Sequence, residues 1–140
     1  MAKITQFQGY QSARAPSIPK PDHPVDPMIV NVQDGVPVVY PGCHGVGVRV
    51  VHPVNPRAPS KNHSLVQFYV PPHVVLEPSS HETEETYVIL AGQGLMTFTN
   101  FQREVQKGDF IYLPPWCSHG IENTGNEMLE VLICTSPPNP

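Results

Sequence analysis

Proline is spread through the whole chain, and it is the residue that most limits what this sequence can fold into. The chain has 18 prolines among its 140 residues. Each proline lacks a backbone N–H donor and breaks the interior of an α-helix. A helical bundle is therefore excluded, and short extended runs joined by rigid turns are the architecture that this composition favours.

From Val36 onward, short β-rich runs alternate with turn residues. Valine, isoleucine, leucine and aromatic residues concentrate in the runs, while Gly, Pro and Asn separate them. No stretch of about 10 to 12 residues between turns has a helical period, so we expect an all-β sandwich or barrel. The predicted strands are Val36–Tyr40, Val46–Val51, Ser64–Val70, Val74–Glu77, Thr86–Leu90, Leu95–Phe98, Phe101–Val105, Asp109–Leu113 and Leu129–Thr135.

The first 30 residues differ from the rest, because they are polar and rich in proline. We expect residues 1–30 to form an extended arm that cannot build a core of its own and that lies on the domain or on a partner subunit. Residues 31–140 are long enough for one β-barrel domain with a core. The prolines of the arm are Pro16, Pro19, Pro21, Pro24 and Pro27.

Charge, hydropathy and the cysteine count limit the partners and the compartment that we expect for this chain. Charged residues make up 14% of the chain, and 8 basic against 12 acidic groups give a net charge of −4 without any Lys/Arg cluster, so we expect no nucleic-acid partner. No apolar run approaches membrane-spanning length, and the start Met1–Thr5 lacks the apolar stretch of a signal peptide. We therefore expect no membrane partner. Three cysteines without a C-x-x-C pair predict reduced thiols in a cytoplasmic protein.

Two spaced groups of residues carry the chemistry of the chain. Together they supply two imidazoles and one carboxylate, from His81, His119 and Glu85. This ligand set suits a divalent transition metal and leaves positions open for substrate or water, so the site can be catalytic. The first group is His81, Glu85 and Gly92, and the second is Gly108, Pro114, His119 and Asn123.

These two groups resemble the motifs of the cupin superfamily, whose members are small jelly-roll β-barrels with a metal in the barrel mouth. In the first motif, His81 is followed after three residues by Glu85 and after six more by Gly92. The second motif matches from Gly108 to Asn123, with Trp116 where glycine is usual. The resemblance covers about residues 64–135. It implies a cupin-type jelly-roll β-barrel with metal ligands at His81, Glu85 and His119.

The chain departs from the family pattern at two positions of the first motif. Ser79 stands where the first histidine is usual, and His73 stands where the opening glycine is usual. The motif therefore does not supply a site of three imidazoles and one carboxylate. A hydroxyl is a poor transition-metal ligand, so we expect water or a substrate oxygen at position 79. His73 is the reserve candidate for a fourth ligand.

The alternation of side chains along a strand predicts which residues share the interior with the ligands. If the strands are regular, Glu77 and Ser79 point inward with His81, and Tyr87 points inward with Glu85. Polar groups inside a small barrel are costly without partners, which favours a bound metal or ligand. At the end of the second motif, Asn123 is expected to fix a turn.

Tyr87 and Glu77 are the candidate catalytic residues, because they are the inward titratable groups that the metal does not use. A nearby cation would lower the pKa of the Tyr87 phenol and make it a usable base, as in some cupin lyases, or Tyr87 is a plain barrel-wall aromatic. Glu77 is either a general acid or base or a strand-end carboxylate that reaches solvent.

Three functions remain open. The favoured one is a metal-dependent enzyme acting on a small polar or aromatic metabolite, with non-haem Fe(II) dioxygenase-type chemistry suggested by the ligand set. Zn(II), Mn(II) or Ni(II) would instead favour a lyase, isomerase or cyclase using Tyr87 or Glu77 as acid or base. The third is a non-catalytic cupin that binds a small molecule. The resemblance and the arm also imply a homodimer.

Overall fold

The computed structural model describes residues 2–9 and 18–139, and it places ten β-strands in this part of the chain. Apart from the short 3-10 turn η1 (Val32–Asp34), this part contains no helix. The strands are β1 (Val36–Val38), β2 (Val46–Val51), β3 (Ser64–Val70), β4 (Val75–Ser79), β5 (Glu84–Ala91), β6 (Gln93–Thr97), β7 (Gln102–Gln106), β8 (Phe110–Leu113), β9 (His119–Asn123) and β10 (Leu129–Ser136).

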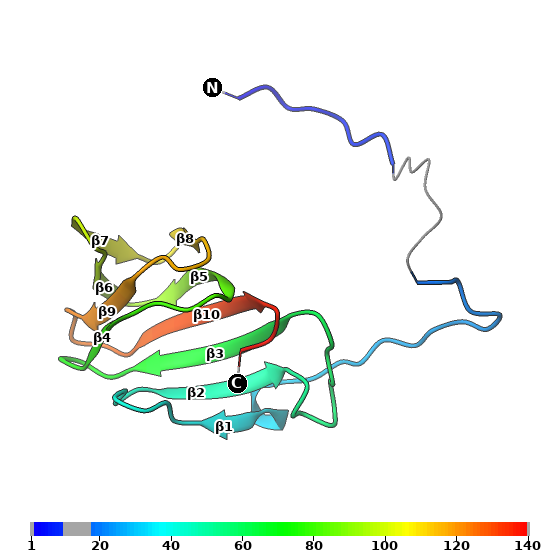
Figure 1. The fold of residues 1–140 in the computed structure, drawn as a ribbon, viewed down its shortest axis with the longest axis horizontal. Helices are drawn as coiled ribbons and strands as arrows, with labels where there is room; N and C mark the ends of the chain where they lie inside the picture. Colours follow the sequence, from blue (N-terminus) through cyan, green and yellow to red (C-terminus); the bar gives the residue numbers. More distant parts are fainter. Residues whose placement is uncertain (1, 10–17, 140) are drawn as a thin grey trace.

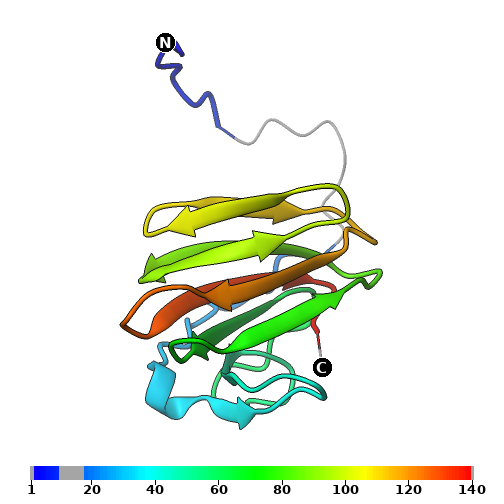
Figure 2. The ribbon, with the colours of Figure 1, turned by 90° about the vertical axis from the view of Figure 1, so that its left-hand side faces the viewer.

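The strands form two antiparallel sheets that pack face to face (Figures 1 and 2). The larger sheet has the order β1-β2-β3-β10-β5-β8, and the smaller has the order β4-β9-β6-β7. The chain therefore crosses repeatedly between the layers, and β10 at the C-terminal end lies between β3 and β5. This arrangement confirms the predicted all-β jelly roll.

The core lies between the two sheets and follows from the alternation of side chains along the strands. On β3, every second residue from Ser64 to Val70 is buried, and β10 shows the same pattern from Leu129. Phe68, Ile89 and Met96 are among the largest fully buried side chains. Burying such a side chain contributes about 1.5–3 kcal/mol, so these inner faces hold the layers together.

Asn123 closes the end of β9 by satisfying three backbone groups. It is fully buried, and its Nδ2 donates to the carbonyls of Val70 (2.7 Å) and Glu127 (2.8 Å). The backbone N–H of Gly125 donates to Asn123 Oδ1 at 2.9 Å. The expectation that Asn123 fixes the turn is confirmed, and its side chain also joins the β9–β10 turn to the end of β3.

Replacing Asn123 by alanine is expected to lower the free energy of unfolding by about 2–4 kcal/mol, because buried backbone groups lose their partners. Urea denaturation measures the change. Asn126→Ala in the same turn is the control, since Asn126 is exposed and should change stability by less than about 0.5 kcal/mol. Equal stability of the two variants would contradict the role given to Asn123.

Residues 18–31 lead away from η1, next to β1, and Figure 1 shows this part of the chain running away from the sheets. Residues 18–29 are all exposed and lie in neither strand nor helix. Part of the predicted arm, residue 1 and residues 10–17 with Pro16, lies outside the described residues. Within the described ranges, no helix is long and apolar enough to cross a membrane.

Candidate metal centre

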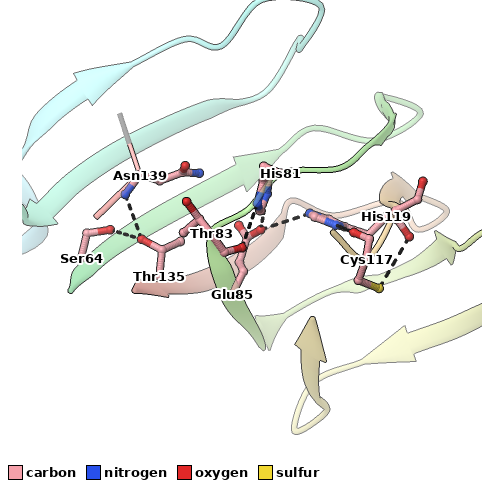
Figure 3. A network of polar contacts seen from close by, with 9 residues as sticks. Ser64, His81, Thr83, Glu85, Cys117, His119, Thr135 and Asn139 are labelled. Atoms are coloured by element: carbon pink, nitrogen blue, oxygen red, sulfur yellow. Dashed lines mark hydrogen bonds and ion pairs between the residues drawn. The ribbon is translucent and has the colours of Figure 1, made fainter. Parts of the chain in front are cut away.

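Three side chains from separate places in the fold converge between the sheets (Figure 3). Glu85 lies on β5 of the larger sheet, His119 begins β9 of the smaller sheet, and His81 lies in the connection between β4 and β5. Their ligand atoms all lie within 4.8 Å of one another. Glu85 Oε2 is 2.9 Å from His81 Nε2 and 3.1 Å from His119 Nε2. These are the three residues that the sequence predicted as ligands.

Backbone carbonyls fix the orientation of both imidazoles. His81 Nδ1 lies 2.9 Å from the carbonyl of Thr83, and His119 Nδ1 lies 2.9 Å from the carbonyl of Cys117. A carbonyl oxygen only accepts hydrogen bonds, so each Nδ1 must carry the proton. In the neutral ring, each Nε2 therefore presents a lone pair to the site, which is the tautomer that binds a metal.

With neutral imidazoles, the three described side chains place a buried carboxylate against two lone pairs without a positive charge. Glu85 is only 4% exposed, and its Oε2 has no hydrogen-bond donor among the described residues when both histidines are neutral. A buried carboxylate facing two lone pairs is unfavourable unless a cation lies between them. The donor set therefore fits a divalent metal ion, and His81, Glu85 and His119 could hold one.

The Glu85 carboxylate also shifts the pKa of His119. Burial alone would lower the pKa of His119, but the Glu85 carboxylate and the Cys117 carbonyl together outweigh burial and raise the pKa. A proton on His119 can thus supply the missing positive charge when no metal does. Proton and metal would compete for the same lone pair.

A cavity of about 360 Å³ opens onto the three residues. Its wall is mainly apolar and includes Tyr40 and Phe68, whose rings stack with centroids 6.3 Å apart. Polar groups of Glu77, Ser79 and Asn139 also line it. This volume lies in the range of small-molecule sites, and a mostly apolar wall with a few polar groups is typical of them.

Tyr87 is buried in the wall of this cavity beside His119. The two rings meet edge to face, with centroids 5.6 Å apart. Burial, followed by the charge of Glu85, raises the pKa of Tyr87 well above its ordinary value. This direction holds without a bound cation, whose charge would act in the opposite sense. Without a cation, Tyr87 keeps its proton at neutral pH, and its hydroxyl can donate a hydrogen bond into the cavity.

Glu77 and Ser79 lie at the rim of the cavity instead of deep inside it. Both line the cavity, yet both are exposed. The pairing of β4 with β9 shifts register between Leu76 and Ser79, so the regular alternation assumed for this strand does not hold. Leu76 packs against the core, while Ser79 lies opposite His119.

His73 does not join the metal-ligand cluster. It is exposed, and its backbone N–H donates to the carbonyl of Asn123 at 3.1 Å. Asn123 and His119 occupy opposite ends of β9, which are about 13 Å apart for a strand of this length. The structure therefore does not support His73 as the reserve fourth ligand.

Other cavity residues were missed because the motifs do not contain them. Tyr40 and Cys43 come from the loop between β1 and β2, and Asn139 follows β10. Only the folding of these distant segments over the ligands brings them to the cavity. The Pro41-Gly42 turn was visible in the sequence, but it gave no indication of where the loop would lie.

Trp116 holds a backbone conformation that explains why glycine is usual at its position. Its φ is +66°, in the left-handed region that bulky residues avoid. Its backbone N–H donates to the carbonyl of His81 at 2.8 Å, so this conformation also supports a ligand residue. The side chain itself is 65% exposed.

At position 116, glycine should give a more stable protein than alanine, by about 1 kcal/mol, because only glycine adopts this φ without strain. Thermal unfolding of Trp116→Gly and Trp116→Ala measures the difference. The same pair of substitutions at Ser80 is the control, since this exposed residue does not have a positive φ and alanine should be preferred there. The same preference at both positions would contradict the strain at Trp116.

Comparison with known families supports the fold and the motifs. The family model of the cupin domain matches residues 66–135, half of the chain, which include all three metal-ligand candidates. The chain is also 53% identical over 58 residues to an uncharacterized protein of Methanocaldococcus jannaschii. That match covers 41% of this chain and 46% of the relative, so the chain spans about half the length of the curated relative it matches.

Solved structures show the same fold at low sequence identity. A structure described as a predicted oxalate decarboxylase of Thermotoga maritima is 23% identical, with a TM-score of 0.66 over 79% of this chain and 99% of that chain. The polyketide cyclase RemF of Streptomyces resistomycificus is 20% identical, with a TM-score of 0.69 over 80% of each chain. At such identities, these likenesses bear on the fold alone.

Proposed function

This chain belongs to the cupin domain family, and on that premise we propose that it is a metal-dependent enzyme acting on a small metabolite bound in the cavity beside His81, Glu85 and His119. The observation that carries the proposal is the convergence of two Nε2 lone pairs on the buried Glu85 Oε2. A merely structural site would be closed by four protein ligands, whereas three leave room for a substrate.

The ligand set favours Fe(II) and dioxygenase-type chemistry. Two histidines and one carboxylate on one side of the ion are the set that non-haem Fe(II) oxygenases use. Fe(II) bound here would supply open positions for O₂ and substrate. The chain's own residues would bind and orient the substrate, with Tyr40 and Phe68 as apolar walls and Ser79 as a polar group at the rim of the cavity.

Tyr87 favours a second candidate, a lyase, isomerase or cyclase. The Tyr87 phenol beside His119 can donate a hydrogen bond to a substrate whose developing charge a Lewis-acidic metal would stabilise. A bound cation would also lower the raised pKa of Tyr87 toward the range in which the phenol transfers a proton. Glu77 at the rim of the cavity would be the partner that exchanges protons with solvent. In this alternative, Zn(II), Mn(II) or Ni(II) serves as well as Fe(II).

Elemental analysis of protein purified without oxygen, followed by nitric oxide binding, tests the proposal. About one metal ion per chain supports a metal enzyme, and absence of metal even after reconstitution would favour a non-catalytic binding protein. Nitric oxide is a diatomic analogue of O₂. The electron paramagnetic resonance spectrum of a high-spin Fe(II) nitrosyl is expected if the iron has an open position. Stoichiometric zinc, manganese or nickel with Fe(II) unable to replace it would favour the second candidate.

Ser79→His is expected to tighten metal binding, because position 79 lies directly across from His119 in the β4–β9 pair. A fourth ligand there would also occupy a position that substrate needs, so turnover should fall. Slower loss of metal to a chelator measures the first effect. Ser80→His, at the next exposed position outside the cavity lining, is the control and should lose metal at the wild-type rate.

A further inference from the structure

The largest cavity described lies outside the metal site and is walled by aromatic side chains. It has a volume of about 580 Å³ and extends over the β6–β7 turn, β8 and the segment around Trp116. We call its aromatic wall the aromatic groove, and its members are Phe98, Phe101, Phe110, Tyr112 and Trp116. Four of the five are 57–74% exposed, and only Phe98 is partly buried.

So much exposed aromatic surface in one place marks a binding surface, because single soluble domains rarely leave it uncovered. The groove also lies at the ends of both sheets. Among the described strands, β8 ends the larger sheet and β7 ends the smaller one, so each has an edge that no other described strand pairs with. Trp116 contributes its indole from a strained backbone, and such strain is concentrated at functional positions.

The arm carries a pattern that matches an aromatic groove. Pro21, Pro24 and Pro27 are spaced three apart. A polyproline II helix has three residues per turn, so these prolines lie on one face when the arm adopts that conformation. Val25 and Met28 follow the last two prolines and add apolar groups beside that face; both are exposed in the structure. Grooves lined by aromatic residues are the usual receptors for such segments, whose preformed helix loses little entropy on binding.

From these two features we propose that the arm of one copy of this chain, through Pro21, Pro24 and Pro27, docks in the aromatic groove of a second copy. The face of the arm that carries these three prolines cannot reach the aromatic groove of its own chain. The arm joins the barrel beside β1, at the opposite end of the larger sheet from β8 (Figure 1). Five strand spacings of about 4.8 Å separate these two strands, about 24 Å in all.

The tether between Pro27 and the barrel is too short for that span. Five residues lead from Pro27 to Val32, where η1 begins, and they reach about 16 Å as a polyproline II segment. Docking in a second copy has no such limit. Two copies that exchange arms through a twofold axis fill both grooves, which gives a closed dimer.

Sedimentation equilibrium of the full chain tests the proposal. The wild type is expected at twice the 15.5-kDa chain mass. Changing Pro21, Pro24 and Pro27 to alanine together, or Phe110→Asp alone, should raise the dimer dissociation constant by about thirtyfold or more, as loss of an aromatic hot spot does. Pro19→Ala, off the three-residue repeat, and Val54→Asp, an exposed apolar position outside the groove, are the matched controls and should leave the dimer intact.

Trp116 reports directly on the groove, because it is the only tryptophan in the chain. Its emission should move to longer wavelength as the wild type is diluted through the dimer dissociation constant. The triple-alanine variant should show the dissociated spectrum throughout. Adding a peptide of residues 18–31 to that variant should restore the wild-type emission, and a peptide with the same three substitutions should not.

Three results would overturn the proposal. A dimer that survives both the arm and the groove variants uses another face. The other two results begin with a monomeric wild type. If its Trp116 emission does not depend on concentration but changes in the triple-alanine variant, the arm docks in the groove of its own chain. If the emission is the same in the wild type and in the triple-alanine variant, the arm does not dock in a groove. Mixing the triple-alanine variant with Phe110→Asp provides a further test, since the pair retains one intact arm and one intact groove and should associate more strongly than either alone.

Discussion

His119→Ala is expected to strip the purified protein of stoichiometric metal. His119 supplies one of only three ligand atoms, and its imidazole is oriented by the Cys117 carbonyl so that Nε2 points at Glu85. Removing even an orienting partner behind a ligand typically costs about 10–100-fold in metal affinity, so loss of the ligand itself should cost more. Elemental analysis after gel filtration measures the remaining metal.

The matched control is His73→Ala, which removes an imidazole of the same kind from an exposed turn outside the cluster. This variant should keep full metal content. Circular dichroism confirms that both variants keep their strands. Full metal occupancy in each of His81→Ala, Glu85→Ala and His119→Ala would show that the metal binds elsewhere.

The second large effect is expected from Tyr87→Phe. This change keeps the ring that packs edge-on against His119 and removes only the hydroxyl, so fold and metal content should survive. If Tyr87 transfers a proton to substrate, turnover should fall by about 10²–10⁴, the usual contribution of a positioned acid or base. Turnover of the substrate that the wild type consumes is the measurement.

Tyr69→Phe is the control for that change, because Tyr69 lies on β3 next to inward-facing Phe68 and does not line the cavity. It should leave turnover unchanged. Unchanged turnover in Tyr87→Phe would make Tyr87 a wall residue. If the activity also needs Fe(II) and O₂ and tolerates Glu77→Gln, the oxygenase proposal gains and the lyase, isomerase or cyclase alternative is excluded.

Two strands could be predicted from the sequence with their exact bounds. β2 and β3 begin and end at the predicted residues, because both are rich in valine or aromatic residues and both are bounded by turn signals. β9 was not among the predicted runs. It contains a glycine and three polar side chains, and it forms because β4 and β6 pair with it on both sides. Pairing of that kind overrides local propensity.

The ligand cluster could be predicted, whereas its surroundings could not. Motif spacing identified His81, Glu85 and His119, which the fold brings together. Strict alternation along the strand predicted that Glu77 points into the interior. The register of β4 is irregular, and Glu77 lies at the rim of the cavity. The imidazoles are oriented by the carbonyls of Thr83 and Cys117. These carbonyls belong to the backbone, so the residue types in the sequence do not predict their role.

Glu85 and His119 belong to different sheets, and an ion shared between them would act as a removable cross-link through the core. Like any ligand that binds only the folded state, it would add free energy of unfolding in proportion to the logarithm of its concentration, about 2.7 kcal/mol at 100 times its dissociation constant. The supply of metal in the cell would then govern how long each molecule lasts. Metal-starved molecules would open more often and be degraded sooner, so an inactive protein would also be a short-lived one.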